Sequence, residues 1–232
     1  MTSRRHRDKG YRAIVFAVSA CIVAFASLAY PIETNRKTNV PSESGRMALG
    51  ILAGYGLFSN SNFGNSVAFG ATFTYGFSKN VAVELAGLFL SAKNKNDPAG
   101  LSQGRLTMLP LQLSLLGRLP LGRKLTPYAL AGVTYFLNGF ASDQALEDDW
   151  HDLGFTLTEK VNGAVGFHVG AGLEYDLGKK LAAGIGVRYC LGKTRGEWSL
   201  KDDASAVESS GTFSGLDLNT MVISAGLKFF LK

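Results

Sequence analysis

Charge, cysteine and long hydrophobic runs are all scarce in this sequence. Charged residues make up 18% of its 232 residues, which together with abundant glycine argues against a disordered chain. Only two cysteines are present, Cys21 and Cys190, and because Cys21 lies in a segment that we expect to be removed, no internal disulfide is expected. After residue 45 no stretch approaches the roughly 18 apolar residues of a membrane-spanning helix, so the sequence predicts no further transmembrane helix.

Glycine and aromatic residues are plentiful instead. The chain contains 28 glycines, and aromatic residues make up 11% of it. Because glycine destabilises helices, this composition does not favour a helical enzyme, and repeated short strands within one domain are the first structure to test. The formal charge of +6 does not indicate a nucleic-acid partner, since five basic side chains and Asp8 in residues 1–29 account for +4 and leave about +2 on the rest.

The N-terminus has the three-part layout of a secretory signal peptide. Residues 1–12 are basic, residues 13–29 are apolar or small, and Ser27 and Ala29 provide small residues for a cleavage site after residue 29. Two alternatives remain open, an uncleaved membrane anchor and a lipoprotein modified at Cys21. We predict a signal peptide over residues 1–29 and a short periplasmic lead-in over residues 30–44.

From residue 45 onward, large apolar residues alternate with small or polar ones. In residues 165–175 the odd positions carry Val, Phe, Val, Ala, Leu and Tyr, and the even positions carry Gly, His, Gly, Gly and Glu. In a β-strand these two sets face opposite sides of the sheet. The alternation predicts eight strands, over residues 46–58, 66–77, 81–93, 105–118, 126–138, 163–177, 181–200 and 215–231.

The face without large residues indicates which side is inside. It is rich in Gly, Ala and Ser with isolated charges, which suits a narrow barrel interior, and the large apolar set would then face lipid. A soluble lipocalin-like barrel also has eight strands, but it would carry the large residues inside and leave a Gly/Ala-rich exterior that is hard to keep soluble. In lipid an open sheet edge would leave backbone groups without partners, so the sheet must close.

The connections between the predicted strands alternate between shorter and longer ones. The shorter links are residues 78–80, 119–125 and 178–180, and the longer ones are residues 59–65, 94–104, 139–162 and 201–214. Outer-membrane barrels have short periplasmic turns and longer outside loops. We therefore predict an all-β, up-and-down, eight-stranded antiparallel transmembrane β-barrel over residues 45–232, with both termini in the periplasm.

Several of these strands resemble those of a known family. Residues 109–115 (LPLQLSL) and 127–135 (PYALAGVTY) resemble a pair of strands in OmpW-type outer-membrane barrels, within the wider group of OmpA- and OmpX-like barrels. Residues 170–175 with 181–189, and residues 216–230, resemble the next hairpin and the last strand. The resemblance implies a place in the bacterial outer membrane, with membrane lipid, lipopolysaccharide and the barrel-assembly machinery as partners. It also implies an apolar vestibule from which hydrophobic solutes leave sideways through the wall.

Eight polar residues are predicted to face the lumen. They are Arg46, Glu84, Gln112, Arg118, His168, Glu174, Arg188 and Lys228. Charges inside a barrel are costly unless they are paired or hydrated, so they form either a network of ion pairs that plugs the lumen or a polar constriction that admits small solutes. His168 has no partner at metal-ligand spacing, and no spacing supports a catalytic pair with a serine such as Ser114, so we expect no enzyme, metal or cofactor.

The longest predicted loop, residues 139–162, is acidic and partly aromatic. Its acidic residues suit either a solvated surface or contact with a divalent cation or partner. Four apolar residues could line the vestibule, namely Phe140, Trp150, Phe155 and Leu157. The predicted function is passive passage of small or hydrophobic solutes, and the alternative is a non-transporting surface barrel whose loops bind partners.

Overall fold

The computed structural model describes residues 45–94, 103–121, 124–205 and 207–231. The predicted signal peptide over residues 1–29 and the lead-in over residues 30–44 lie outside the described residues.

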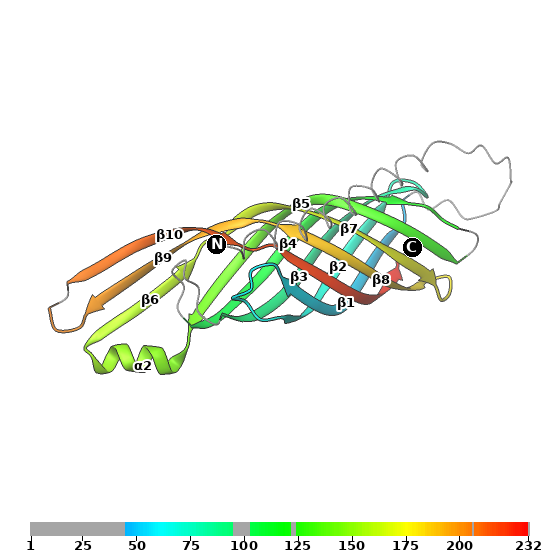
Figure 1. The fold of residues 1–232 in the computed structure, drawn as a ribbon. Helices are drawn as coiled ribbons and strands as arrows, with labels where there is room; N and C mark the ends of the chain where they lie inside the picture. Colours follow the sequence, from blue (N-terminus) through cyan, green and yellow to red (C-terminus); the bar gives the residue numbers. More distant parts are fainter. Residues whose placement is uncertain (1–44, 95–102, 122–123, 206, 232) are drawn as a thin grey trace, which may run out of the picture.

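Eight strands close into a barrel in which every neighbouring pair is antiparallel (Figure 1). In the order in which they pair they are β1 (Met47–Phe58), β11 (Thr220–Phe230), β8 (Leu181–Leu191), β7 (Ala164–Asp176), β5 (Leu125–Ser142), β4 (Gly104–Arg118), β3 (Val81–Asn94) and β2 (Ser66–Gly76). The first strand pairs with the last from Ala48 opposite Phe230 to Phe58 opposite Thr220. This closure confirms the predicted fold class.

The alternation in the sequence decides which side chains face outward. On β4, Leu111, Leu113 and Leu115 are 40–59% exposed, whereas the intervening Gln112 and Ser114 are buried. The same pattern runs along β2 and β3, whose buried and exposed residues alternate. The barrel therefore has an apolar outer wall and an interior of small and polar side chains, as the sequence predicts.

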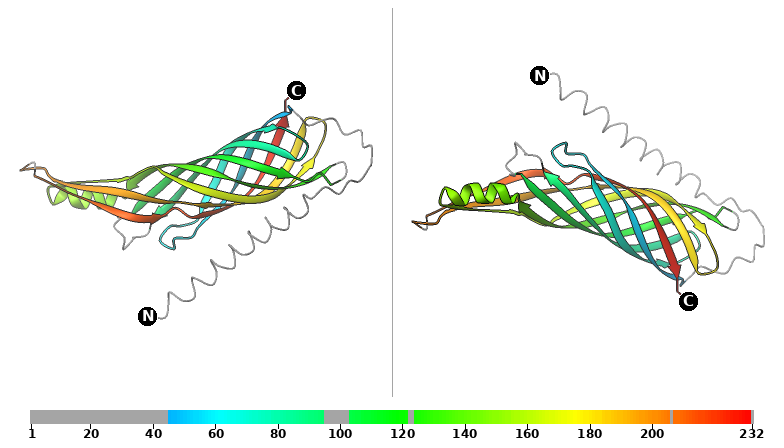
Figure 2. Two further views of the ribbon diagram at one scale, coloured as in Figure 1. Left: turned by 90° about the horizontal axis from the view of Figure 1, so that it is seen from above. Right: turned by 90° about the horizontal axis from the view of Figure 1, so that it is seen from below.

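Three further strands form a separate sheet beyond one end of the barrel. They are β6 (Phe155–Val161), β9 (Lys193–Asp202) and β10 (Glu208–Asp217), in the order β10-β9-β6. Figure 2 shows this sheet extending away from the barrel mouth, roughly along the direction of the barrel. We call this end of the barrel the sheet end. The opposite end carries the short turns at residues 77–80 and 177–180 and the described ends of the chain, and we call it the turn end.

A short helix, α2 (Gln144–Asp152), precedes β6. The side chain of Asp143 caps its N-terminus by accepting a hydrogen bond from the N–H of Ala145. Gly154 follows the end of the helix, and its φ of +81° favours glycine. The N–H of Gly154 donates to the carbonyl of His151. No helix in the described part of the chain is long and apolar enough to cross a membrane.

Three expectations about local structure were wrong. The predicted strand over residues 181–200 is two strands, β8 and β9, which separate at Gly192, and the predicted strand over residues 215–231 is likewise divided at Leu218 and Asn219. At both places the chain passes from the barrel to the outer sheet, and the crossing is fixed by hydrogen bonds from Gly192 N–H to Asn219 Oδ1 (3.0 Å) and from Leu218 N–H to the Gly192 carbonyl (2.9 Å). The predicted loop over residues 139–162 contains the end of β5, helix α2 and β6.

Candidate functional site: the barrel lumen

Five charged side chains from five different strands meet inside the barrel, in the half nearer the turn end. They are Glu84 (β3), Arg118 (β4), Glu174 (β7), Arg188 (β8) and Lys228 (β11), and we call them the charged floor. Arg118 Nη2 lies 2.9 Å from Glu174 Oε2, and Arg188 Nη2 lies 2.7 Å from Glu84 Oε1. Lys228 Nζ joins the two pairs, because it contacts Glu174 Oε1 and lies 3.8 Å from Glu84 Oε2.

The charged floor is buried, and each of its three cations contacts at least one of its two carboxylates. Its side chains are only 4–14% exposed, so water screens them little. Each carboxylate faces two cations, which is the arrangement that a buried charge requires. The adjoining cavity is about 50 Å³ and is lined by Tyr128 as well as by charged side chains, so it has room for only a few water molecules. The floor therefore closes the lumen rather than leaving a wide aqueous channel.

A layer of uncharged polar side chains lies beside the floor. Arg188 Nη1 donates to Gln112 Oε1 at 2.9 Å, and Gln112 Nε2 donates to Cys190 Sγ at 3.1 Å. His168 of β7 lies directly opposite Cys190 and is fully buried. This layer extends the network toward the sheet end and contributes no Asp, Glu, Lys or Arg side chain to it.

His168 is held between two hydroxyl groups. Its Nε2 lies 2.8 Å from Ser114 Oγ, and its Nδ1 lies 2.8 Å from Thr134 Oγ1. No spacing along the sequence joins Ser114 to His168, because the register of β4, β5 and β7 sets their proximity. A hydroxyl rather than a carboxylate orients the ring, and Ser114 is 1% exposed, so a nucleophilic triad is not assembled here. No group of three His, Cys, Asp or Glu residues in the described ranges could hold a metal ion.

Arg46 lies apart from the other seven polar residues predicted for the lumen. Its Nη2 donates to the carbonyl of Lys179 at 2.7 Å, and its guanidinium carbon lies 3.7 Å from the centre of the Phe230 ring. Both partners belong to the turn end, where β7 turns into β8 and β11 ends. Arg46 thus fastens the last strand at the rim of the barrel.

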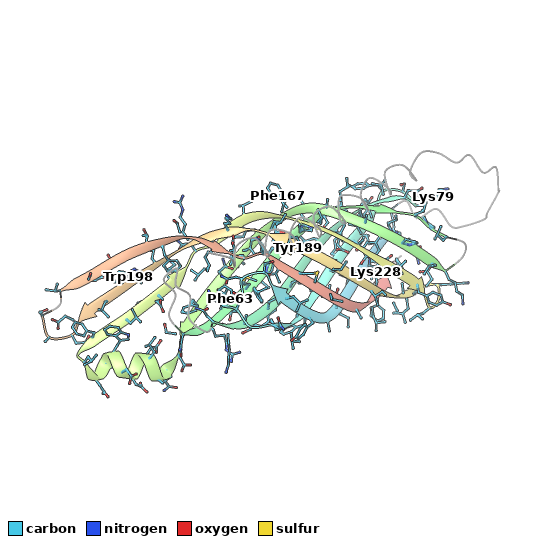
Figure 3. The ribbon with its side chains drawn as sticks, in the orientation of Figure 1. Phe63, Lys79, Phe167, Tyr189, Trp198 and Lys228 are labelled. Atoms are coloured by element: carbon cyan, nitrogen blue, oxygen red, sulfur yellow. The ribbon has the colours of Figure 1, made fainter. Side chains whose placement is uncertain are left out.

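The half of the lumen nearer the sheet end is apolar. A buried cluster runs from this half of the barrel into the base of the outer sheet, to which Val161, Phe213 and Leu216 belong, and we call this region the upper lumen; its members are Phe63, Ala92, Leu106, Met108, Phe136, Val161, Cys190, Phe213, Leu216 and Leu218. The Phe136 ring lies over two glycines, since a Cβ at Gly166 or Gly192 would come within 2.8 or 2.5 Å of it. In Figure 3, Phe63 lies near the sheet and Lys228 lies toward the turn end, so the apolar and charged regions follow one another along the barrel.

One face of the outer sheet continues the inward face of the barrel. Register places Leu157 of β6 opposite Leu200 of β9, and Trp198 packs against the cluster that fills the upper lumen. Trp150 of α2 meets Phe155 edge-on, with ring centres 6.3 Å apart and an angle of 84° between the planes. We call these five half-buried residues the apolar face of the sheet.

The structure thus places the four residues predicted for the vestibule around the sheet end. Phe140 packs against the cluster of the upper lumen, and the other three belong to the apolar face. Trp198 and Leu200 were not predicted as part of this face, although the alternation in residues 194–200 places them on one side. The alternation over residues 181–200 predicts a single membrane strand, so it does not separate these two residues from the barrel wall.

The opposite face and the tip of the outer sheet are polar. Thr156, Thr158 and Lys160 of β6 are exposed, as are the acidic residues of α2. At the tip, the Ser205 hydroxyl and the N–H groups of Ala204 and Ser205 donate to Asp202, and these hydrogen bonds lower the pKa of Asp202 below its usual range. The sheet therefore has one polar face and one face on which apolar residues surround Glu159, which lies opposite Trp198.

The backbone pairing between β3 and β4 is interrupted at two positions. The two strands pair at Gly87 opposite Leu111 and again at Leu90 opposite Met108, but the two pairs between them are missing. Pro110, which has no N–H to donate, occupies this place on β4. On the outer side, an apolar depression of about 320 Å³ begins at Leu111 and runs over β3, β4, β5 and β7.

Comparison with known proteins supports this architecture. Residues 17–229 match the family model described as the outer membrane protein beta-barrel domain. The crystal structure of OprG from Pseudomonas aeruginosa is similar over 81% of this chain and 96% of that one, with 17% identity and a TM-score of 0.58. The solution structure of outer membrane protein W from E. coli covers 81% of this chain and 98% of its own, with 18% identity and a TM-score of 0.48. No curated protein matches the sequence.

At this identity the similarity to OprG shows the fold, and with the family match it confirms the predicted resemblance to the wider group of small outer-membrane barrels. The family model covers most of the chain, including every strand of the barrel except the last residue of β11. The closed eight-stranded barrel, the apolar outer wall and the family match agree with one another. The chain belongs to the family of outer membrane protein beta-barrel domains and is a protein of the bacterial outer membrane.

Proposed function

We propose that this barrel carries small hydrophobic solutes passively from outside the cell into the outer membrane. The solute binds to the apolar face of the sheet, passes into the upper lumen and leaves sideways through the wall near Pro110. The observation that carries this proposal is the change from an apolar upper lumen to a charged floor within one tube. We assign no reaction to the protein, because the buried Ser114–His168 pair lacks an accessible nucleophile.

The proposal includes an orientation in the membrane. Outer-membrane barrels have short periplasmic turns and longer structures outside the cell. The turn end, with the described ends of the chain, then lies in the periplasm, and the outer sheet lies outside the cell. Closure of β1 on β11 next to the turn end is the step that we expect the barrel-assembly machinery to assist.

The charged floor explains why a hydrophobic solute would not continue into the periplasm. To pass, the solute would have to separate buried ion pairs and leave charges in an apolar surrounding, which costs several kcal/mol for each ion. The floor has paired charges and only a small cavity, so a hydrophobic solute gains nothing by entering it. A solute in the upper lumen is therefore directed to another exit.

The interrupted ladder supplies that exit. Between Gly87 and Leu90 no backbone pairing with β4 needs to be broken, because Pro110 donates no hydrogen bond there. At the interruption, the side chain of Leu88 faces the lumen and that of Phe89 faces outward. The depression that begins at Leu111 provides an apolar surface on the lipid side. Displacing apolar side chains at this place would open a route from the upper lumen into the membrane.

Substitution of the apolar face tests the proposal. We expect the double variant Trp150→Ser and Phe155→Ser, reconstituted in liposomes, to lose most of its uptake of a hydrophobic solute. The matched control is Lys160→Ser with Lys201→Ser on the polar face of the same sheet, which should take up the solute as the unchanged protein does. Equal uptake by the two double variants would exclude the proposed route.

A second candidate function is binding of a partner by the outer sheet. Among the described residues, no strand pairs with the outer edge of β10, so its backbone groups are open to an extended segment of another molecule. Proline substitutions at Ser210 and Thr212 would hinder such pairing. They should leave solute uptake unchanged if the sheet serves both roles.

A further inference from the structure

We propose that Lys93 and Arg105 form a binding site for a phosphate group of lipopolysaccharide in the outer leaflet. This inference rests on the proposed orientation, in which the sheet end faces the outside. It does not depend on the transport of a solute.

The two cations stand side by side on the outer wall. Lys93 of β3 is directly opposite Arg105 of β4, and both side chains are exposed on the face that carries the apolar residues of the barrel. Like charges in directly opposite positions destabilise a sheet. Among the described residues neither side chain forms an ion pair. Arg105 Nη1 donates a long hydrogen bond, of 3.4 Å, to Ser91 Oγ. An anion bound between the two would remove this repulsion.

The position along β3 matches the level of the lipid headgroups. Val81 begins the strand at the turn end, and Lys93 follows it by twelve residues. At about 3.3 Å per residue and a tilt of about 40°, this separation corresponds to roughly 30 Å along the membrane normal. The apolar band of an outer-membrane barrel is about 25 Å tall, so the two cations lie just beyond it.

The surroundings of the pair are small and uncharged. The outward neighbours are Ser91 and Thr107 on the same two strands and Gly139 and Ala141 on β5. Gly139 has open space where a side chain would stand, so a bulky headgroup can approach the backbone beside Arg105. An arginine can bind a phosphate through two parallel hydrogen bonds while a lysine adds a point charge.

Other exposed cations on the molecule have different surroundings. Lys193 on β9 already faces Asp217, with the charged atoms 3.8 Å apart. Lys79 and Lys180 lie in turns at the turn end, on the side away from lipopolysaccharide in the proposed orientation. The pair on β3 and β4 combines two facing cations, the outer headgroup level and an adjoining open surface.

Binding of lipid A tests the assignment. The full chain, refolded in neutral detergent, would be titrated with lipid A carrying both phosphates, and the bound fraction measured by native mass spectrometry. We expect Lys93→Gln with Arg105→Gln to bind about thirtyfold more weakly, since each cation near a charged membrane surface contributes about tenfold or somewhat less. The control Lys79→Gln with Lys180→Gln makes the same change in charge at the turn end and should bind as the unchanged protein does.

Two comparisons can overturn the assignment. Dephosphorylated lipid A should bind weakly and equally to the unchanged protein and to the Lys93/Arg105 variant. Equal affinity of both proteins for phosphorylated lipid A would exclude the site, and binding of phosphatidylglycerol as tightly as lipid A would exclude lipopolysaccharide as its ligand. The Lys93/Arg105 variant should retain heat-modifiable gel mobility, and if the proposed function is right it should also retain solute uptake. The two proposals can therefore fail separately.

Discussion

The two halves of the lumen are both filled by side chains, but these side chains are charged in one half and apolar in the other. Near the turn end the interior is filled by ion pairs drawn from five strands, whereas near the sheet end it is filled by aromatic and aliphatic side chains. Both halves are built on the same strands with the same alternation of inward and outward residues. The difference shows that alternation fixes the architecture, while the few inward residues that are not small decide what each part of the tube can admit.

Loss of a carboxylate from the floor should have the largest effect. Glu174→Gln would remove the carboxylate that both Arg118 and Lys228 contact inside the barrel, and we expect the free energy of unfolding to fall by about 3–5 kcal/mol. Glu84→Gln should cost less, because Arg188 also donates to Gln112. Unfolding in urea would measure both, with the exposed Glu208→Gln as the control. A Glu174 variant as stable as the control would contradict the account of the floor.

Removal of a ring from the upper lumen should come next. Phe136→Ala would leave a cavity beside Gly166 and Gly192, lowering the free energy of unfolding by about 3 kcal/mol and raising uptake of hydrophobic solutes. Phe167→Ala on the adjacent β7 removes the same ring from the lipid-facing wall, where it is 64% exposed (Figure 3). That control should cost less stability and leave uptake as it was. Unchanged uptake in Phe136→Ala would mean that the upper lumen is not on the route.

At the interrupted pairing between β3 and β4 we expect a smaller effect on stability than at Phe136 and a larger effect on uptake. Pro110→Ala restores an N–H and should allow β3 and β4 to pair throughout, adding about 1 kcal/mol of stability and reducing uptake several-fold. Pro127→Ala is the matched control, since Pro127 lies on β5 where pairing with β7 is continuous. Liposome uptake measured alongside unfolding would separate the two changes. Similar uptake by the two proline variants would argue against lateral release.

The smallest effect is expected at the tip of the outer sheet. The hydrogen bonds that lower the pKa of Asp202 favour its charged form, so their contribution is present above the usual pKa of aspartate and is lost as the pH falls through the lowered value, below about pH 4. Asp202→Asn should therefore speed hydrogen exchange at Ala204 and Ser205 at neutral pH and remove its dependence on acid. Barrel stability should be unchanged, as in the control Asp148→Asn on α2. A loss of barrel stability in Asp202→Asn would show that the tip and the barrel are coupled.

Most of the barrel could be predicted from the sequence because a period of two is a local property. The eight strands of the barrel, their closure and the inward direction of Glu84, Glu174 and Arg188 all follow from that alternation. The pairing of the charges could not be read in the same way. Arg188 and Glu84 are 104 residues apart, and only the register of the closed sheet brings them together.

The outer sheet escaped prediction for a related reason. The period of two runs from β8 through Gly192 into β9 and therefore predicts one strand, although the odd positions change there from apolar residues to Lys193, Arg195 and Glu197. Helix α2 did carry a local signal, the capping residue Asp143 before an acidic first turn, but the acidic composition favoured a solvated loop.

The single-residue passage at Gly192 also bears on how this surface can change over evolutionary time. The arms of the β9–β10 hairpin are rigid continuations of β8 and β11, joined to them through one residue and two residues respectively. Lengthening both arms by two residues would carry the tip farther from the cell and keep Trp198 and Leu200 on their present side. Lengthening each arm by one residue would exchange its two faces from that point onward, so the polar face would turn inward. Relatives with longer or shorter hairpins should therefore differ by even steps in each arm.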